Sequence, residues 1–151
     1  LALASKLQGQ LQAVDISAEA RALARVNAET LALSEKIDFF EGDLLEPLKG
    51  SFHMICANLP YIPSSEMKGL MPDVGLHEPH LALDGGPEGL DPILRLLGQA
   101  STRMEPQGRI LLEIWPASLA SLEEKASKFS WLLEDTVRDL AGHHRIAVMK
   151  R

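Results

Sequence analysis

Cysteine and aromatic residues are scarce in this chain of 151 residues. The one cysteine, Cys56, cannot form an internal disulfide, which favours a reducing compartment. It lies in the apolar run Met54-Ile55-Cys56-Ala57, so we expect a buried structural thiol. The chain also has a single tyrosine, Tyr61.

Long hydrophobic runs and basic clusters are missing as well. No apolar stretch approaches the roughly 20 residues that cross a bilayer, and residues 1–11 lack the pattern of a signal peptide. We therefore expect a cytoplasmic protein with no membrane partner. The formal net charge is −6, from 21 acidic and 15 basic residues, so stable binding to nucleic acid is not expected.

Hydrophobic residues make up 46% of the chain and charged residues 24%, which is typical of one globular domain spanning residues 1–151. Apolar and turn patterns predict strands and helices in alternation. This order predicts a doubly wound α/β sheet, mostly parallel, with one antiparallel strand from a C-terminal hairpin. The predicted strands are 10–16, 36–40, 52–58, 109–115, 131–140 and 145–149, and the helices are 1–7, a segment from the N-cap Ser17 to about 33, 91–104 and 118–129.

Ligands of such sheets lie beyond the carboxyl ends of the strands, where Asp15 and Asp43-Leu44 are found. Asp15 can accept hydrogen bonds from ribose hydroxyls, although a strand-end aspartate also caps turns. Asp43 can receive the amine of an adenine while Leu44 packs on the ring, although Gly42-Asp43 is also ordinary turn chemistry.

The segment Asn58-Leu59-Pro60-Tyr61, called here the 58–61 segment, carries the strongest signal. The Asn58 side-chain oxygen and the carbonyl of Leu59 or Pro60 can accept both N–H groups of a carboxamide and stabilise the charge that develops on its nitrogen. Tyr61 can cover the flat face of that group. No general base is then required. The alternative is a plain turn that ends a strand.

Two weaker patterns remain. His77-Glu78-Pro79-His80 resembles a metal cluster, but the proline prevents one helical face from presenting both histidines, so no metal site is predicted. Glu113 lies within an apolar strand, where a carboxylate needs a hydrogen-bonding partner. It could shape the site from the neighbouring strand or pair with a loop amide, and we favour the second interpretation.

The chain resembles the HemK-type protein-glutamine methyltransferases. The resemblance implies a Rossmann-like class I fold, S-adenosylmethionine as the methyl donor, and the glutamine of the Gly-Gly-Gln motif of peptide chain release factors as the acceptor. It also implies cofactor binding by Asp15, Ile16, Asp43, Leu44 and Asn58, substrate binding by Asn58, Leu59, Pro60 and Tyr61, and catalytic roles for Asn58, Pro60 and Tyr61. The resemblance rests on Ala13-Val14-Asp15-Ile16-Ser17, Glu41-Gly42-Asp43-Leu44, Ala57-Asn58-Leu59-Pro60-Tyr61-Ile62-Pro63, Glu78-Pro79, the run at residues 81–91, Leu111-Leu112-Glu113-Ile114 and the run at residues 139–145.

Two departures from that family are visible. Leu59 stands where the family usually has a second proline, a position where the backbone matters more than the side chain. The family's first strand, its Gly-rich loop and its small helical domain are not in the sequence, so we expect a catalytic domain that is incomplete at its N-terminus. Two alternatives stay open: an enzyme that methylates the adenine amino group of RNA or DNA, and an inactive truncated module.

Overall fold

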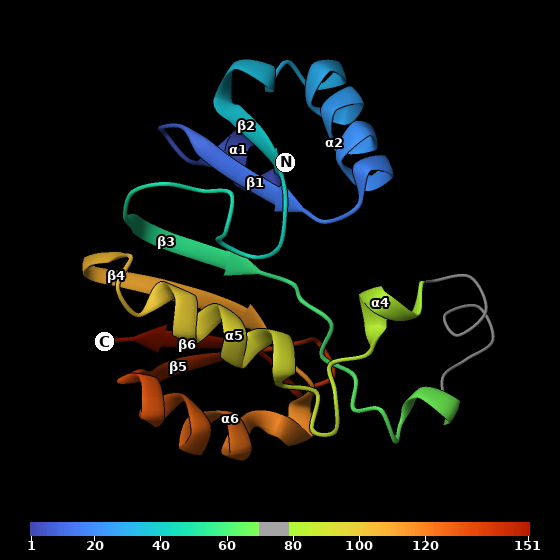
Figure 1. Ribbon diagram of the computed structural model, residues 1–151, viewed down its shortest axis with the longest axis vertical. Helices are drawn as coiled ribbons and strands as arrows, with labels where there is room; N and C mark the ends of the chain where they lie inside the picture. Colours follow the sequence, from blue (N-terminus) through green and yellow to red (C-terminus); the bar gives the residue numbers. More distant parts are fainter. Residues whose placement is uncertain (70–78) are drawn as a thin grey trace. The chain divides into compact units, whose positions relative to one another are not determined.

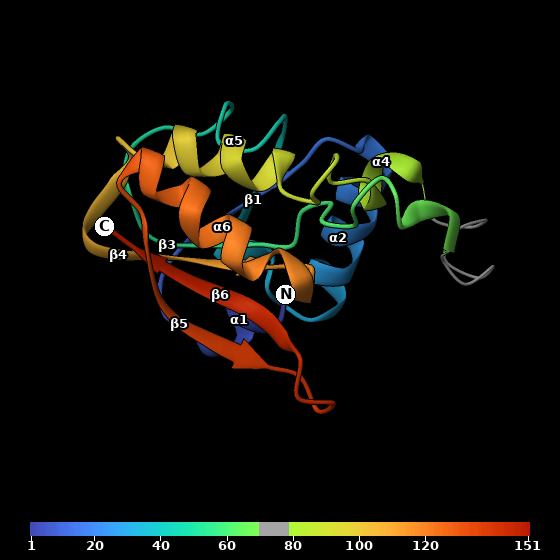
Figure 2. The ribbon, with the colours of Figure 1, turned by 90° about the horizontal axis from the view of Figure 1, so that it is seen from below.

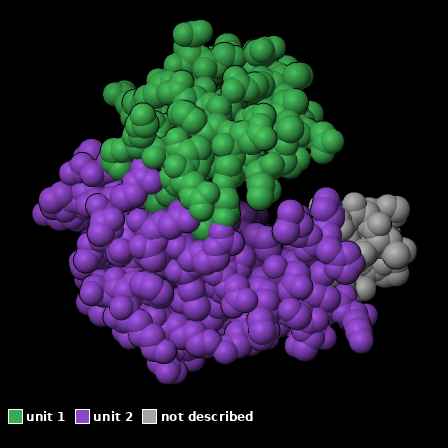
Figure 3. Space-filling model, viewed as in Figure 1, with its two compact units in different colours: residues 1–50 green, residues 51–151 purple. Residues whose placement is uncertain are grey.

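The computed structural model describes residues 1–69 and 79–151. The chain divides into two compact units, residues 1–50 and residues 51–151 (Figure 3). The predicted strands are present as a two-stranded sheet in the first unit and a four-stranded sheet in the second. Each unit is described by itself below.

The first unit is a strand-helix-strand element preceded by a short helix (Figure 1). β1 and β2 are parallel, with Leu11 opposite Ile37 and Asp15 opposite Glu41. The Ser17 hydroxyl accepts a hydrogen bond from the Ala20 amide at 3.1 Å, which confirms the predicted N-cap. The elements are α1 (Ala2–Lys6), β1 (Leu11–Asp15), α2 (Ala18–Thr30), η1 (Ser34–Lys36) and β2 (Ile37–Glu41).

The second unit holds the four-stranded sheet in the order β3-β4-β6-β5. β3 and β4 are parallel, and β6 is antiparallel to both β4 and β5, which confirms the predicted C-terminal hairpin. The elements are β3 (Phe52–Ala57), η2 (Met67–Gly69), α4 (His80–Leu83), α5 (Asp91–Ala100), β4 (Met104–Glu113), η3 (Pro116–Ser118), α6 (Leu119–Ala126), η4 (Ser127–Phe129), β5 (Leu132–Arg138) and β6 (His144–Lys150).

The core of the second unit lies between this sheet and helices α5 and α6, which cover the same face (Figure 2). Trp131 is fully buried there, and its indole N–H donates to the carbonyl of Leu97 in α5 at 3.0 Å. Leu122 of α6 and Met149 of β6 are equally buried. Side chains on this face alternate with those on the other, as the period of a strand requires.

The prediction that Cys56 is a buried structural thiol is wrong. Met54 is 48% exposed, and Cys56 is exposed rather than buried. The reason is that α5 and α6 both lie on one face of the sheet. Ile55 and Ala57 pair with the fully buried Ile110 and Leu112, so Met54 and Cys56, which alternate with them along β3, point to the other face.

The start of β4 also differs from the prediction. The predicted helix at residues 91–104 ends earlier, at Ala100, and the strand predicted at residues 109–115 begins earlier, at Met104, and includes Pro106 and Gln107. Gln107 has a φ of +65°, and the register with β3 shifts between Phe52 and Met54. The proline is therefore accommodated in a bulge near the beginning of the strand.

Candidate functional site

The first group of candidate residues follows the carboxyl ends of β1 and β2. Asp15 closes β1, and its carbonyl accepts the Gly42 amide at 3.3 Å, which links the two strand ends. One oxygen of the Asp15 carboxylate accepts the Ser17 amide at 2.8 Å, so the side chain caps its own turn. Asp15 is exposed, and the neighbouring Ile16 side chain is 60% exposed.

The turn after β2 has a defined shape. Leu44 adopts a left-handed conformation with a φ of +53°, which few residues other than glycine adopt without cost. A Cβ atom on Gly42 would lie 2.8 Å from Cγ of Pro47, so Gly42 allows the chain to fold closely over the proline. Asp43 is therefore presented on a tight turn beside the end of β1.

The second group is the 58–61 segment, which follows β3 in the second unit. Asn58 is exposed, and its side chain makes no hydrogen bond within the described residues. The carbonyl of Pro60 lies against Gly85, where an added Cβ atom would be 2.8 Å from the oxygen. The Leu59 carbonyl accepts no backbone N–H in the described part of the chain. The Asn58 side chain and the Leu59 carbonyl are therefore acceptors of this segment that have no hydrogen-bond partner within the described residues.

Tyr61 is held by Glu113, the last residue of β4. The phenol hydroxyl donates to Oε1 of Glu113 at 2.8 Å. Our preferred interpretation of Glu113, pairing with a loop amide, was therefore wrong, and the alternative, that it shapes the site from the neighbouring strand, fits the contact. Burial raises the pKa of Tyr61, the hydrogen bond to Glu113 and the charge of that carboxylate raise it further, and Arg145 acts in the opposite sense. Tyr61 is thus a protonated donor at neutral pH.

The run at residues 81–91 forms the support of the 58–61 segment. The Ile62 amide donates to the Leu83 carbonyl at 3.0 Å, and the Gly85 amide donates to the Ile62 carbonyl at 2.9 Å. A third bond joins the Ser64 amide to the Gly86 carbonyl at 2.9 Å. These bonds place the run alongside the residues that directly follow Tyr61.

Glycines allow this close approach. A Cβ atom on Gly85 would be 2.8 Å from the Pro60 carbonyl oxygen and 2.8 Å from the Cα of Tyr61. Gly89 has a φ of +70°, and its Cβ atom would overlap the carbonyl oxygen of Tyr61. These two positions therefore require glycine because backbone of the 58–61 segment occupies the space of a side chain.

Two carboxylates hold the run to the rest of the unit. Asp84 accepts the Ser64 hydroxyl at 2.7 Å and the Gly86 amide at 2.9 Å, and both bonds lower its pKa. Glu88 pairs with Lys125 of α6 at 2.5 Å, which, together with Ser121, lowers the pKa of Glu88. The resemblance to the HemK-type enzymes identifies this run, and Gly85, Gly86 and Gly89, which follow the 58–61 segment, are a further signal of close backbone packing.

The structure brings some of the predicted residues together and leaves others separate. Asp15 is joined to the turn that carries Asp43 and Leu44, and Tyr61 is joined to Glu113. The first set belongs to residues 1–50 and the second to residues 51–151. The juxtaposition of Asn58 with the strand ends of the first unit therefore stays a prediction.

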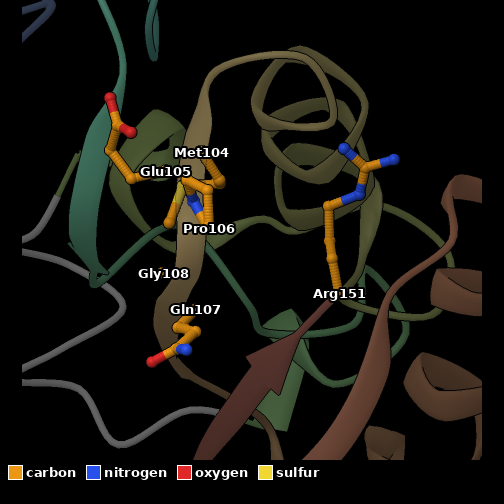
Figure 4. A pocket seen from close by; sticks show the side chains of 6 residues that line it. All are labelled: Met104, Glu105, Pro106, Gln107, Gly108 and Arg151. Carbon is orange, nitrogen blue, oxygen red and sulfur yellow. The ribbon is translucent and has the colours of Figure 1, made fainter.

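Other candidate features lie outside this site. A cavity of about 240 Å³ is lined by residues 104–108 and Arg151 (Figure 4), at the opposite end of β4 from Glu113. His77 and Glu78 lie outside the described residues. Within residues 1–69 and 79–151, no three His, Cys, Asp or Glu side chains are grouped as metal ligands would be. No helix in those ranges combines the length and apolar character of a membrane span.

Comparison with known proteins identifies the relatives of this chain. No family model matches it. A release factor glutamine methyltransferase of Gloeobacter violaceus is 38% identical over 153 residues, which cover 98% of this chain and 53% of the relative. The chain is homologous to the release factor glutamine methyltransferases. A protein of that name from Synechocystis is 43% identical over 71% of this chain and 37% of its own length. The chain thus spans about half or less of the relatives it matches.

Solved structures confirm the fold. A methyltransferase of Pyrococcus furiosus has a TM-score of 0.71 at 16% identity, covering 98% of this chain and 65% of its own. A ribosomal protein L11 methylase of Lactobacillus delbrueckii has a TM-score of 0.65 at 20% identity, covering 94% of this chain and 57% of its own. At these identities the likeness concerns architecture alone. The fold is that of the Rossmann-like class I methyltransferases.

Proposed function

We propose that this chain is the catalytic part of an S-adenosylmethionine-dependent protein-glutamine N-methyltransferase, acting on the Gly-Gly-Gln glutamine of peptide chain release factors. The names of its relatives support this assignment. The structural observation that carries it is the 58–61 segment, in which an exposed Asn58 and an available Leu59 carbonyl stand beside a fixed Tyr61. A cytoplasmic location belongs to the same proposal.

The chemistry follows from the acceptor. The lone pair of a carboxamide nitrogen is delocalised, so the group must be held in one orientation for that lone pair to reach a methyl donor. The Asn58 side-chain oxygen and the Leu59 carbonyl accept its two N–H groups and stabilise the positive charge that develops on nitrogen. Pro60 restricts the backbone at this point. Because Tyr61 keeps its proton, the methylated nitrogen loses its proton to solvent.

Residues of the first unit suit the cofactor. The Asp15 carboxylate uses one oxygen for the Ser17 amide, which leaves the other for ribose hydroxyls. The exposed Ile16 and the left-handed Leu44 offer apolar surface to an adenine ring, and Asp43 offers an acceptor for its amine. When bound, S-adenosylmethionine supplies the electrophilic methyl group. The assignment of these residues rests on their positions at the strand ends.

A second protein substrate has a specific observation in its favour. A relative from Neisseria gonorrhoeae, 40% identical over 70% of this chain and 35% of its own length, is named a ribosomal protein uL3 glutamine methyltransferase. The chemistry shared by both names is methylation of a glutamine side chain. The 58–61 segment fits that amide in either protein, so surfaces outside it must select the partner.

The test uses the full-length parent protein with methyl-labelled S-adenosylmethionine and, separately, purified release factor, uL3 and ribosomal RNA. A release factor whose Gly-Gly-Gln glutamine is replaced controls for the site. Asn58→Ala removes the proposed acceptor, and Asn27→Ala, at an exposed position of α2, is the matched control.

Label that enters only the intact release factor, and is lost in Asn58→Ala alone, is the expected result. Label in uL3 instead would change the partner and keep the chemistry. Label in RNA would move the assignment to the adenine enzymes, and no label anywhere would favour the inactive module.

A further inference from the structure

We propose that Glu113 is a positioning residue for methyl transfer, which fixes the ring of Tyr61 through the tyrosine hydroxyl and thereby orients the acceptor amide. The inference rests on the proposed function. It begins with the 2.8 Å hydrogen bond from the Tyr61 hydroxyl to Oε1 of Glu113, which joins residues 52 positions apart in sequence.

The register of the sheet explains why Glu113 reaches Tyr61. β3 and β4 are parallel, and Ala57 pairs with Leu112. Glu113 therefore ends its strand beside the point where the 58–61 segment leaves β3. The Glu113 carboxylate, which follows the buried Leu112, therefore has the Tyr61 hydroxyl as its hydrogen-bond partner.

The hairpin between β5 and β6 completes this arrangement. The Arg145 carbonyl accepts the amide of Ile114, the residue after Glu113, at 3.0 Å. The Arg145 guanidinium is close enough to the phenol to lower the pKa of Tyr61, and it lies 3.7 Å from the Asp139 carboxylate. Asp139 in turn accepts the amides of Ala141 and His143 at 2.9 Å and 3.0 Å. Glu113 is thus the direct partner of Tyr61, and Arg145 is the charge beside it.

Fixing the ring matters because a tyrosine side chain otherwise rotates about two bonds. Gly85 and Gly89 of the run at residues 81–91 pack on the backbone of Tyr61, at its Cα atom and its carbonyl group. A hydrogen bond to a charged acceptor is the additional constraint. Because a misplacement of about 1 Å can cost on the order of a hundredfold in rate, a released ring should lower kcat by roughly ten- to a hundredfold.

The experiment uses the full-length parent protein and a double-mutant cycle. Glu113→Leu removes the acceptor, Glu113→Gln keeps an oxygen at the same reach, and Tyr61→Phe removes the hydroxyl while keeping the ring. We expect Glu113→Leu and Tyr61→Phe to lower kcat by similar factors, Glu113→Gln to restore most of it, and the double variant to lose no more than either single one. Glu134→Leu, which removes the partner of Arg109 on the same sheet, is the matched control.

A second readout needs no activity. The absorbance of tyrosinate, taken as the difference between each protein and its Tyr61→Phe counterpart, reports the pKa of Tyr61. That pKa should fall from wild type to Glu113→Gln and again to Glu113→Leu. If the parent protein methylates no glutamine, the proposed function is refuted. A pKa of Tyr61 that differs among the wild type, Glu113→Gln and Glu113→Leu would still support the hydrogen bond between Tyr61 and Glu113. Equal titration in all three proteins overturns the inference, as does an undiminished effect of Glu113→Leu in the Tyr61→Phe background.

Discussion

Gly85 and Gly89 provide a direct energetic test of the packing between the 81–91 run and the 58–61 segment. Three glycine-to-alanine variants separate the contributions. Gly142→Ala adds a Cβ atom at a φ of +87° with nothing within 4 Å, so it reports the cost of the left-handed backbone alone, about 1–2 kcal/mol. Gly85→Ala has no such backbone cost, but its Cβ atom would lie 2.8 Å from backbone atoms of Pro60, Tyr61 and Gly89, which should cost about 1–3 kcal/mol.

Gly89→Ala combines both effects, because its φ is +70° and its Cβ atom would overlap the Tyr61 carbonyl oxygen. We expect a loss of unfolding free energy of about 2–5 kcal/mol, the approximate sum of the two terms. Equilibrium urea unfolding of the full-length parent and the three variants measures these differences. A loss for Gly89→Ala equal to that for Gly142→Ala, or a neutral Gly85→Ala, would refute the close packing described here.

Two further predictions concern stability. The pKa values of Asp84 and Glu88 are lowered in the folded protein, so their stabilising effect is present above the ordinary carboxyl pKa of about 4 and is lost as the pH falls through the lowered values. The rate of amide hydrogen exchange at Gly85 and Gly89, relative to the rate in β6, should therefore rise in acid. A ratio of these two rates that does not change with pH would contradict this prediction. Trp131→Phe should lower the free energy of unfolding by about 1–3 kcal/mol, because it shrinks a fully buried side chain and removes the hydrogen bond to Leu97. An unaltered midpoint of thermal unfolding would show that the indole does not contribute to stability.

Local signals in the sequence predicted most of the elements. Ser17 ahead of Glu19 and Ala20 predicted the cap of α2, and the short connection between the strands predicted at residues 131–140 and 145–149 predicted the antiparallel hairpin of β5 and β6. These features depend on neighbours in sequence, so a pattern of a few residues is sufficient to specify them.

The features that escaped prediction depend on partners distant in sequence. The exposure of Cys56 follows from which face α5 and α6 cover, and the partner of Glu113 follows from the register of β3 and β4. The position of Gly89 against Tyr61 likewise requires the loop to return after about 28 residues. The sequence predicts that the candidate residues lie at strand ends, and the structure shows the hydrogen bond to Glu113 that holds Tyr61.

Mass spectrometry of the methylated product tests the central claim most directly. Release factor incubated with the full-length parent protein and S-adenosylmethionine should carry one added methyl group on the side-chain nitrogen of the Gly-Gly-Gln glutamine, and Asn58→Ala should abolish it while Asn27→Ala does not. A methyl group on any other residue of the factor, or the same yield from Asn58→Ala, would contradict the account.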